Sequence, residues 1–378
     1  MKSCPYAKKC SGCQLQNLNY NEQLSMKQVK LIRLLGRYGH IEEIIGMESP
    51  YFYRNKIQSA FGVKNGKIIS GIYQSATHKI TPVDRCMLED ECAEPIVKTV
   101  RELCPSFKIK AYDLYTGAGF LRHALIRKGF STGEIMVTLV TSKGDFKSKR
   151  SFANELLRRH PEITTVVWNI NPTETPLMLG EYSEILYGDG YITDTLCGLS
   201  FRISPRSFYQ VNSIQTEKLY ALAKEYAGLT GNERVIDAYC GTGTIGMTMA
   251  DSAKEIIGVE INSDAVSDAK ENAKQNGIKN IKFYNADAGD FMRSMAEKGE
   301  KADVVITDPP RAGCSIQFLR SLISLSPKRI VYISCNPETL ARDLNTLVKN
   351  GYRVKKMQGV DMFPHTNHVE TIVCLNKQ

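Results

Sequence analysis

A cysteine that could act as a nucleophile stands at residue 335, in the stretch "RIVYISCNPETLARDL" (residues 329–344). It follows an apolar run that predicts a strand, and it precedes Asn336 and Pro337, a pair typical of the turn into a helix. A thiol at this position can be a small side chain that fills the end of a strand. It can also be a nucleophile at the edge of a sheet, and thiolate catalysis then requires a general base as partner.

A candidate for that base lies near the C-terminus, in "DMFPHTNHVETIV" (residues 361–373). His365, His368 and Glu370 gather there, just before a final apolar run, and Pro364 stiffens the turn. Glu370 is the simplest choice of base, because the two histidines can then orient it or contact a substrate. We therefore predict a catalytic pair of Cys335 and Glu370.

A glycine turn in "YCGTGTIG" indicates a nucleotide-like ligand. Gly241, Gly243 and Gly246 form a G-x-G-x-x-G pattern after a predicted strand, and Glu260 lies at the end of the next strand, where an acid binds a ribose diol. Dinucleotides and S-adenosylmethionine both use such turns, so the pattern alone leaves the ligand open.

Two further acids favour S-adenosylmethionine. Asp237 ends the strand before the glycine turn, where a carboxylate would repel a pyrophosphate but attract the ammonium and sulfonium groups of S-adenosylmethionine. Asp287 ends the following strand in "YNADA", where it could accept a hydrogen bond from an adenine amino group. The alternative is that these acids only cap turns. We predict S-adenosylmethionine as the ligand.

The motif "DPPRAG" (residues 308–313) ends the next strand and bears on the methyl acceptor. Enzymes of this fold that methylate amino groups often carry an aromatic residue after the two prolines, whereas Arg311 stands here, and the motif could also be only a rigid turn. A carbon acceptor such as C5 of uracil needs a thiolate at C6 to become nucleophilic, and then a base to remove the C5 proton. Asp308, Cys335 and Glu370 could serve that chemistry at one crevice.

Strands and helices alternate through the C-terminal half and would bring these motifs together. The predicted strands are 233–240, 255–261, 281–288, 302–310 and 329–335, and helical patterns lie between them. This alternation predicts a doubly wound, Rossmann-like parallel sheet with helices on both faces, in a domain that spans residues 199–378.

The N-terminal half has a different pattern. Residues 14–47 look helical, within a segment 1–50 that also carries a cysteine cluster. Residues 51–198 contain short alternating apolar runs separated by turn residues, which predicts a mainly antiparallel β domain with one or two helices. The whole chain is therefore expected to be of the α/β class, with a boundary near residues 195–205.

Composition places the chain among soluble proteins. It has 378 residues, 42% of them hydrophobic and 24% charged, and no run of 18 apolar residues or signal-peptide pattern, so we expect a cytoplasmic location. The net charge of +9 suggests an anionic partner, although a solvated charged surface explains it equally well. Eleven cysteines favour metal ligation or chemistry over disulfides in that compartment.

Together, four motifs resemble the RNA uracil-5-methyltransferase family, which makes 5-methyluridine in tRNA and ribosomal RNA. These are "DAYCGTGTIG", "DPPRAG", "YISCNPETLARDL" and "DMFPHTNHVE", and "SFYQVN" (residues 207–212) matches the family just before them. The resemblance implies that Cys335 is the nucleophile and Glu370 the base. It also implies that Gln210, Tyr239, Glu260, Asp287 and Asp308 contact the cofactor. Asp237, Gly241, Gly243 and Thr244 complete the predicted cofactor site. Tyr239 and Thr244 stand where many relatives have Phe and Asn.

Three cysteines close to the N-terminus, Cys4, Cys10 and Cys13, together with Cys86 could ligate zinc or an iron–sulfur cluster, and their spacing does not separate the two. Family members with this pattern carry a [4Fe–4S] cluster on these four positions, which is what the resemblance implies here. Cys92 and Cys104 are the rivals of Cys86 as the fourth ligand. No redox step is needed for methyl transfer, so we expect that the cluster has a structural role or helps to shape the RNA-binding domain.

Basic residues of the central domain are the predicted RNA contacts. Many relatives begin with a small β-barrel RNA-binding domain, which we expect to be absent because Cys4 stands so near the start. Residues 101–150 hold 10 Lys or Arg against 4 Asp or Glu. The candidates for phosphate contact are Arg54, Lys56, Arg122, His123, Arg127 and Lys128. A target base would have to flip out of structured RNA to reach the thiol.

The compact layout resembles family members that act on 23S ribosomal RNA, and tRNA is the main alternative substrate. A nicotinamide-dependent oxidoreductase is a more distant hypothesis, which leaves Asp237 and the Cys335–Glu370 pair unexplained. An iron–sulfur RNA-binding protein with an inactive methyltransferase domain is another. No obligate protein partner or membrane association is expected.

Overall fold

The computed structural model describes residues 4–75, 77–173 and 178–378. The chain forms two compact units. The β-rich unit comprises the described residues of Met1–Gln16, Pro50–Thr195 and Arg202–Arg206, and the α/β unit comprises Asn17–Ser49, Leu196–Phe201 and Ser207–Gln378. The predicted domains are consecutive segments, whereas these units are interleaved: the segment Asn17–Ser49 belongs with the C-terminal half.

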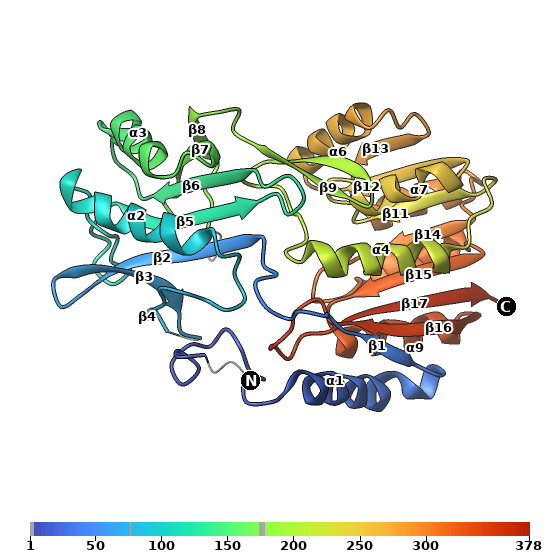
Figure 1. Cartoon of the computed structure of the whole chain (residues 1–378). Coiled ribbons are helices and arrows are strands. Elements are labelled where there is room, and N and C mark those ends of the chain that lie inside the picture. The colour runs from blue at the N-terminus through green and yellow to red at the C-terminus, as the bar shows by residue number, and fades with distance from the viewer. Residues whose placement is uncertain (1–3, 76, 174–177) are drawn as a thin grey trace. The chain divides into compact units, whose positions relative to one another are not determined.

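An eight-stranded sheet forms the centre of the α/β unit (Figure 1), with the strand order β1-β16-β17-β15-β14-β11-β12-β13. Neighbouring strands run parallel except at β17, which is antiparallel to both β15 and β16. The central strands are apolar on both faces, as expected for a parallel sheet covered by helices on both sides. The strands are β1 (Glu42–Ile45), β11 (Arg234–Ala238), β12 (Glu255–Glu260), β13 (Ile281–Asn285), β14 (Val304–Thr307), β15 (Arg329–Ser334), β16 (Tyr352–Val360) and β17 (Glu370–Lys377).

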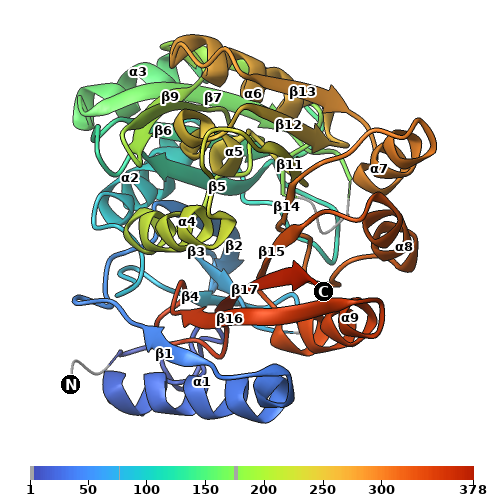
Figure 2. The same cartoon turned by 90° about the vertical axis from the view of Figure 1, so that its right-hand side faces the viewer.

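Helices cover both faces of this sheet, which confirms the predicted alternation of strands and helices. Figure 2 shows α7, α8 and α9 on one face and α4, α5 and α6 on the other. Side chains of Asn262, Asp287, Ser315 and Asn336 cap the first turns of α6, α7, α8 and α9. The helices are α4 (Ser213–Ala227), α5 (Thr244–Thr248), α6 (Ser263–Gln275), α7 (Ala288–Glu297), α8 (Ile316–Leu325) and α9 (Pro337–Lys349), and a 3₁₀ turn (Ala250–Ser252) follows α5.

Helix α1 (Tyr20–Leu35), followed by a 3₁₀ turn (Gly36–Tyr38), belongs to this unit, although residues 50–195 of the other unit stand between its segment and the rest. Its Leu31 and Leu35 belong to the same buried cluster as Leu340, Leu344 and Leu347 of α9. Asn19 and Glu22 form a reciprocal capping box at its start. Packing against α9 therefore brings α1 into the unit that holds the catalytic candidates.

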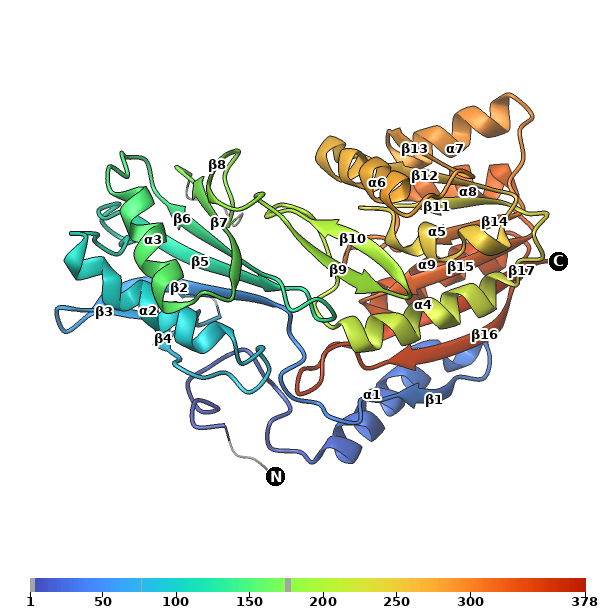
Figure 3. The same ribbon diagram turned by 45° about the horizontal axis from the view of Figure 1, so that its top comes forward.

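A seven-stranded sheet with the order β4-β3-β2-β5-β6-β7-β8 forms the β-rich unit. All its neighbours are antiparallel except β6 and β7, which are parallel and linked by α3, and this confirms a mainly antiparallel domain with two helices. Helices α2 and α3 cover one face (Figure 3) around a buried cluster that includes Phe152 and Trp168. The elements are β2 (Lys56–Lys64), β3 (Lys67–Tyr73), β4 (Ile80–Pro82), α2 (Ala93–Ser106), β5 (Leu121–Lys128), β6 (Ile135–Thr141), α3 (Lys149–Arg159), β7 (Ile163–Ile170) and β8 (Tyr182–Tyr187).

A hairpin of β9 (Ile192–Leu196) and β10 (Leu199–Ile203) forms a separate two-stranded sheet. The chain passes from one unit to the other within this hairpin. The predicted boundary region of residues 195–205 falls on it.

Candidate active site

Parallel strands bring the predicted catalytic and cofactor residues to one edge of the α/β sheet. Asp237 lies at the carboxyl end of β11, Asp308 follows β14, and Cys335 follows β15. Strand β17 runs in the opposite direction, and the pairing of Ser334 with Thr371 places its first residue, Glu370, beside Cys335. The edge therefore carries a thiol and three carboxyl groups drawn from four strands.

The glycine turn joins β11 to α5 by a tight path. Gly241 and Gly243 have φ angles of 55° and 80°, and Tyr239 also has a positive φ of 61°. A Cβ atom on Gly243 would lie 2.7 Å from the ring of Phe283, so a side chain is excluded there. The Gly241 amide donates a hydrogen bond of 3.1 Å to Glu260 Oε2, which holds this carboxylate beside the turn.

Asp237 is a buried carboxyl group with one oxygen that has no protein partner. Its Oδ2 accepts a hydrogen bond of 2.8 Å from the Gly246 amide. Its Oδ1 is buried without a hydrogen-bond partner among the residues that the structure describes. Burial, together with Asp308 and Glu260, raises the Asp237 pKa to about 7. Such a group fits a cationic ligand, which would satisfy the oxygen and stabilise the ionised form.

The other predicted cofactor residues differ in the contacts that they make. The Tyr239 ring lies 5.1 Å from the Phe318 ring, and Thr244 Oγ1 shares a hydrogen bond of 2.9 Å with the Tyr220 hydroxyl. Asp287 is exposed and caps α7, with its Oδ1 accepting from the Asp290 amide at 3.0 Å. The capping role weighed in the sequence analysis is therefore present at Asp287. Gln210 is half-buried in the segment just before α4.

The Cys335 thiol is half-buried and shares its surroundings with two carboxyl groups. Its pKa is raised to about 11, first by burial and then by Glu370 and Asp308, while Arg311 opposes the shift. Burial, and then the charge of Asp308, raises the pKa of Glu370, and desolvation raises the pKa of the half-buried Asp308 to about 7. The free protein therefore holds Cys335 as a thiol at neutral pH.

The DPPRAG turn is fixed to α9, which holds Asp308 next to Cys335. The carbonyl of Arg311 accepts hydrogen bonds from Asn336 Nδ2 at 3.2 Å and from Thr339 Oγ1 at 3.3 Å. Asp343 is fully buried, and its Oδ2 accepts from the Cys314 amide at 2.8 Å and from the Tyr332 hydroxyl at 2.7 Å. Asp343 was not predicted from the sequence, because an acid within a helical pattern carries no local sign of such a contact.

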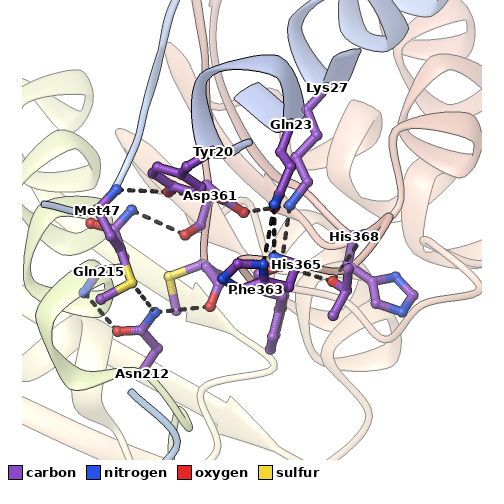
Figure 4. A network of polar contacts seen from close by, with 12 residues as sticks. Tyr20, Gln23, Lys27, Met47, Asn212, Gln215, Asp361, Phe363, His365 and His368 are labelled. Carbon is purple, nitrogen blue, oxygen red and sulfur yellow. Dashed lines mark hydrogen bonds and ion pairs between the residues drawn. The ribbon is translucent and has the colours of Figure 1, made fainter. Parts of the chain in front are cut away.

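Residues 361–369, here called the base loop, lead directly into Glu370 and are held by α1 (Figure 4). Lys27 donates a hydrogen bond of 2.6 Å to Asp361, and both side chains are buried. The Gln23 side chain contacts His365 twice: its Oε1 accepts from the His365 amide at 2.9 Å, and its Nε2 lies 3.1 Å from Nδ1. His365 is buried, whereas His368 lies 3.3 Å from Arg311 Nη2.

Helix α4 and its N-cap residue Asn212 also hold the first residues of the base loop. Asn212 Nδ2 donates to the Met362 carbonyl at 2.9 Å, and Gln215 Nε2 donates to the Asp361 carbonyl at 3.1 Å. The Tyr20 hydroxyl donates to Asp361 Oδ2 at 2.8 Å. These contacts join segments far apart in sequence, so the sequence analysis did not find them.

The N-terminal cysteines belong to the β-rich unit. Cys4, Cys10, Cys13 and Cys86 line one cavity, whereas Cys92 and Cys104 do not, which distinguishes Cys86 from its two rivals. The Gly12 amide donates to Cys10 Sγ at 3.4 Å, and burial raises the pKa of Cys86 to about 12. In the described part of the chain, no group of three or more His, Cys, Asp or Glu is arranged to hold a metal ion.

The cysteine cavity nevertheless has chemistry that fits an anionic, thiolate-bound group. Arg54 lines it, and its Nε is buried without a hydrogen-bond partner among the described residues. The backbone N–H groups of Leu88 and Glu89 lower the pKa of Cys86 and so oppose the effect of burial. N–H groups directed at cysteine sulfurs are a feature of iron–sulfur sites.

Two of the six basic residues predicted to contact RNA are buried in the β-rich unit, and the other four are half-buried. Arg122 and Arg127 are 5% and 3% exposed, and their guanidinium groups donate to carbonyl oxygens of Asn171 and Pro205. Lys128 pairs with Asp90 at 2.9 Å, and burial with the charge of Arg127 lowers the pKa of Lys56 to about 8. Arg54 lines the cysteine cavity, and burial lowers the His123 pKa to about 4. Arg122 and Arg127 are therefore engaged within the unit.

Across the described segments, the helices are too short or too polar to cross a lipid bilayer.

Three comparisons relate this chain to known proteins. The model of a family described as tRNA (Uracil-5-)-methyltransferase matches residues 181–378. A protein described as an uncharacterized RNA methyltransferase from Clostridium acetobutylicum is 45% identical over 99% of this chain and 83% of its own length. A protein with the same description from Halalkalibacterium halodurans is 43% identical over 98% of this chain and 82% of its own length.

A solved structure resembles nearly the whole chain. It is the Pyrococcus abyssi tRNA (uracil-54, C5)-methyltransferase in complex with S-adenosyl-L-homocysteine. The match has a TM-score of 0.80 and 30% sequence identity, and it covers 97% of this chain and 86% of that chain.

Proposed function

Because this chain belongs to the RNA uracil-5-methyltransferase family, we propose that it transfers a methyl group from S-adenosylmethionine to C5 of a uridine in structured RNA. The observation that carries the proposal is the meeting of Cys335, Glu370 and Asp308 at the edge that also holds the glycine turn. These are the groups that methylation of a uracil carbon requires.

The cofactor is proposed to lie along the ends of β11, β12 and β13. When bound, it supplies an electrophilic methyl group on a sulfonium centre. The unpartnered Oδ1 of Asp237 supports this ligand, because it suits the ammonium of a methionine moiety. Glu260 is proposed to bind the ribose and Asp287 the adenine. The proposed set is Gln210, Asp237, Tyr239, Gly241, Gly243, Thr244, Glu260, Asp287 and Asp308.

Cys335 is the proposed nucleophile. Its raised pKa means that its proton must leave before attack, and we assign this proton to the neighbouring Asp308 carboxylate, which leaves the Glu370 carboxylate free for the last step. The thiolate then forms a bond to C6 of uracil, and the electron pair that builds up at C5 takes the methyl group. A cationic ligand close to the thiol would favour the thiolate.

Glu370 is the proposed base of the last step. It removes the proton from C5, the C5–C6 double bond re-forms, and the C6–S bond breaks to release Cys335. Burial raises its pKa, which makes its carboxylate a stronger base once ionised. Asp308, the nearby carboxyl, supports this raised pKa by charge repulsion.

For the substrate, we propose 23S ribosomal RNA, on the resemblance to family members that act on it. tRNA is the second candidate, favoured by the Pyrococcus abyssi enzyme, whose name specifies tRNA uracil-54. The test is methylation of both purified RNAs, from cells lacking this gene, with tritiated S-adenosylmethionine, followed by nucleoside analysis. Label in 5-methyluridine supports the function, and the RNA that carries it identifies the substrate; label only in N-methylated bases contradicts the function.

In the β-rich unit, we propose that Cys4, Cys10, Cys13 and Cys86 hold a [4Fe–4S] cluster with a structural role. The shared cavity, the amide donors and Arg54 support this ligand set. Anaerobic purification with iron and sulfide analysis tests it. Cys86→Ser should lose the iron, and Cys104→Ser, in a cysteine outside the cavity, should retain it. Equal iron in both variants would contradict the assignment of Cys86.

A further inference from the structure

A groove in the β-rich unit carries aromatic and basic side chains on its walls. It has a volume of about 370 Å³ and lies between the β2–β3 hairpin and the loop that follows α2. Its tyrosines are Tyr73, Tyr112 and Tyr115, and His78, Lys64 and Lys79 also line it. We call this the aromatic groove, and none of these residues is among those that the sequence analysis predicted to contact RNA.

The aromatic rings of the groove are held in place by local contacts. Tyr115 is 73% exposed, yet its backbone amide donates to Asp113 Oδ1 at 2.8 Å, which fixes the turn that carries it. The edge of the His78 ring meets the Tyr115 ring at 90° and 5.6 Å. The guanidinium of the buried Arg122 lies 4.7 Å from the centre of the Tyr112 ring and supports it from the interior.

We propose that the aromatic groove binds unpaired nucleotides of the RNA substrate. Exposed aromatic rings with lysines beside them are the combination that binds single strands, because every base can stack on a ring and every phosphate can meet a cation. A volume of this size accommodates a compact ligand of nucleoside size. The inference rests on the proposed function, since it assigns to the β-rich unit a part of the RNA that the α/β unit methylates.

The test measures binding of a labelled single-stranded RNA by fluorescence anisotropy, with cofactor absent. Tyr115→Ala should weaken binding about 10-fold, as expected when one stacked base is no longer supported. Tyr115→Phe should bind like the wild type, because stacking needs only the ring. Tyr182→Ala removes another exposed tyrosine of the same unit, 55% exposed on β8, and should change affinity less than twofold.

The lysines give a second readout. The double variant Lys64→Ala, Lys79→Ala should lower the slope of log affinity against log salt by about 0.7 for each phosphate that no longer meets a lysine. Lys98→Ala, an exposed lysine of α2, should leave that slope unchanged. An effect of the lysines without any effect of Tyr115→Ala would indicate a non-specific polyanion surface and would overturn the proposal, as would equal losses in Tyr115→Ala and Tyr182→Ala.

Failure of the groove and failure of the proposed function give different results. If wild-type protein methylates uridine but the groove variants bind RNA normally, only the groove proposal is wrong. If the wild type makes no 5-methyluridine, the proposed function itself is wrong, whatever the groove variants do.

A second, independent observation concerns α1, whose Gln23 and Lys27 hold the base loop from outside the catalytic sheet edge. We propose that Gln23 is a positioning residue for Glu370. The two contacts of its amide with His365 fix the loop five residues before Glu370, where His365 has a positive φ of 67°. Without them the loop could relax, and Glu370 would lose its alignment with the C5 proton. This proposal also rests on the proposed function.

The test compares Gln23→Leu with Gln28→Leu, on the same helix. The Gln28 side chain bonds to the β1 region instead of the base loop: its Oε1 accepts from the Ile44 amide at 3.0 Å, and its Nε2 donates to the Glu42 carbonyl at 3.3 Å. Gln23→Leu should lower kcat about 10-fold or more and accumulate the methylated protein–RNA adduct, with the KM for S-adenosylmethionine unchanged. Gln28→Leu should do neither.

Equal slowing of adduct formation and adduct release in Gln23→Leu would overturn the positioning role, because a general structural defect affects both steps. So would identical behaviour of the two variants. If Glu370→Gln accumulates the adduct and Gln23→Leu does not, the base assignment stands and only the role of Gln23 is wrong.

Discussion

Sequence patterns predict the positions of functional side chains better in the α/β unit than in the β-rich unit. In the α/β unit, Asp237, Asp308 and Cys335 each end or follow a parallel strand, and parallel strands all end at one edge. In the β-rich unit, Arg122 and Arg127 lie on an antiparallel strand and are both buried. In the α/β unit, the position of a residue at the end of a strand therefore predicts where its side chain lies. In the β-rich unit, positive charge alone did not predict which residues are exposed.

The largest effect is expected at Cys335. Cys335→Ala should lower methyl transfer at least about 1,000-fold, because no other group can form the bond to C6. Turnover with tritiated S-adenosylmethionine measures it, and Cys374→Ala, on β17 of the same unit, is the control. Substantial turnover in Cys335→Ala would contradict the assignment of Cys335 as the nucleophile, which rests on its place at a strand end.

Glu370→Gln should lower turnover about 100-fold to 10,000-fold, as expected for loss of a general base. Methylation itself should still occur once, because the base acts after it. A methylated protein–RNA adduct should therefore accumulate on a denaturing gel. Normal turnover in this variant would show that the pairing of β15 with β17 does not identify the base.

Asp237→Asn should weaken S-adenosylmethionine binding about 10-fold to 100-fold, because the buried oxygen would no longer offer a charge to the ammonium. Isothermal titration calorimetry measures it. RNA binding, which we assign to the other unit, should be unchanged. Asp251→Asn, an exposed acid, should bind the cofactor normally, and equal loss in both variants would contradict the assignment.

The two units should also differ in their response to pH. Between about pH 4 and 7 the folded protein keeps a proton on Asp237 that the unfolded chain has released, so stability falls as pH rises. Lys56, with its pKa lowered to about 8, holds fewer protons folded than unfolded, so its contribution to stability rises above pH 8.

Urea unfolding of Asp237→Asn and Lys56→Met against wild type, from pH 5 to 10, separates these contributions. The asparagine variant should gain stability relative to wild type as pH rises from 5 to 8. The free energy of unfolding of the methionine variant should fall relative to that of the wild type as pH rises above 8. Parallel curves for variants and wild type would contradict the shifted pKa values of both groups.

The smallest effect is expected at Lys128. The sequence analysis predicted a phosphate contact, and the structure pairs this lysine with Asp90. Lys128→Ala should change RNA affinity less than Tyr115→Ala does, by about threefold or less. If RNA affinity falls more in Lys128→Ala than in Tyr115→Ala, the predicted phosphate contact of Lys128 would be supported. The proposal that the aromatic groove binds RNA would then be contradicted.

Local patterns predicted the elements but not the contacts between distant segments. Strand and helix alternation predicted β11 to β15 and their helices, since each is defined by its own periodicity and caps. No local pattern indicated that α1 packs on α9, that Lys27 pairs with Asp361, or that Asp343 fixes the DPPRAG turn. Each of these depends on side chains brought together only by the folded sheet.

The aromatic groove shows the same limit. Tyr73, His78 and Tyr115 are separated along the chain, and none of them belongs to a motif by itself. By contrast, Cys4, Cys10 and Cys13 are close in sequence, and their cluster was predicted from spacing. Cys86 was assigned by resemblance; it lines the same cavity as these three cysteines, whereas Cys92 and Cys104 do not.

The central claim is that Cys335 forms a covalent bond to the target uracil. RNA that carries 5-fluorouridine at the methylated position tests it, because the fluorine cannot leave as a proton and the adduct persists. With S-adenosylmethionine, mass spectrometry of the digested complex should find the methylated nucleotide attached to the peptide that contains Cys335. An adduct on another residue, or none under conditions in which the normal RNA is methylated, would contradict the account.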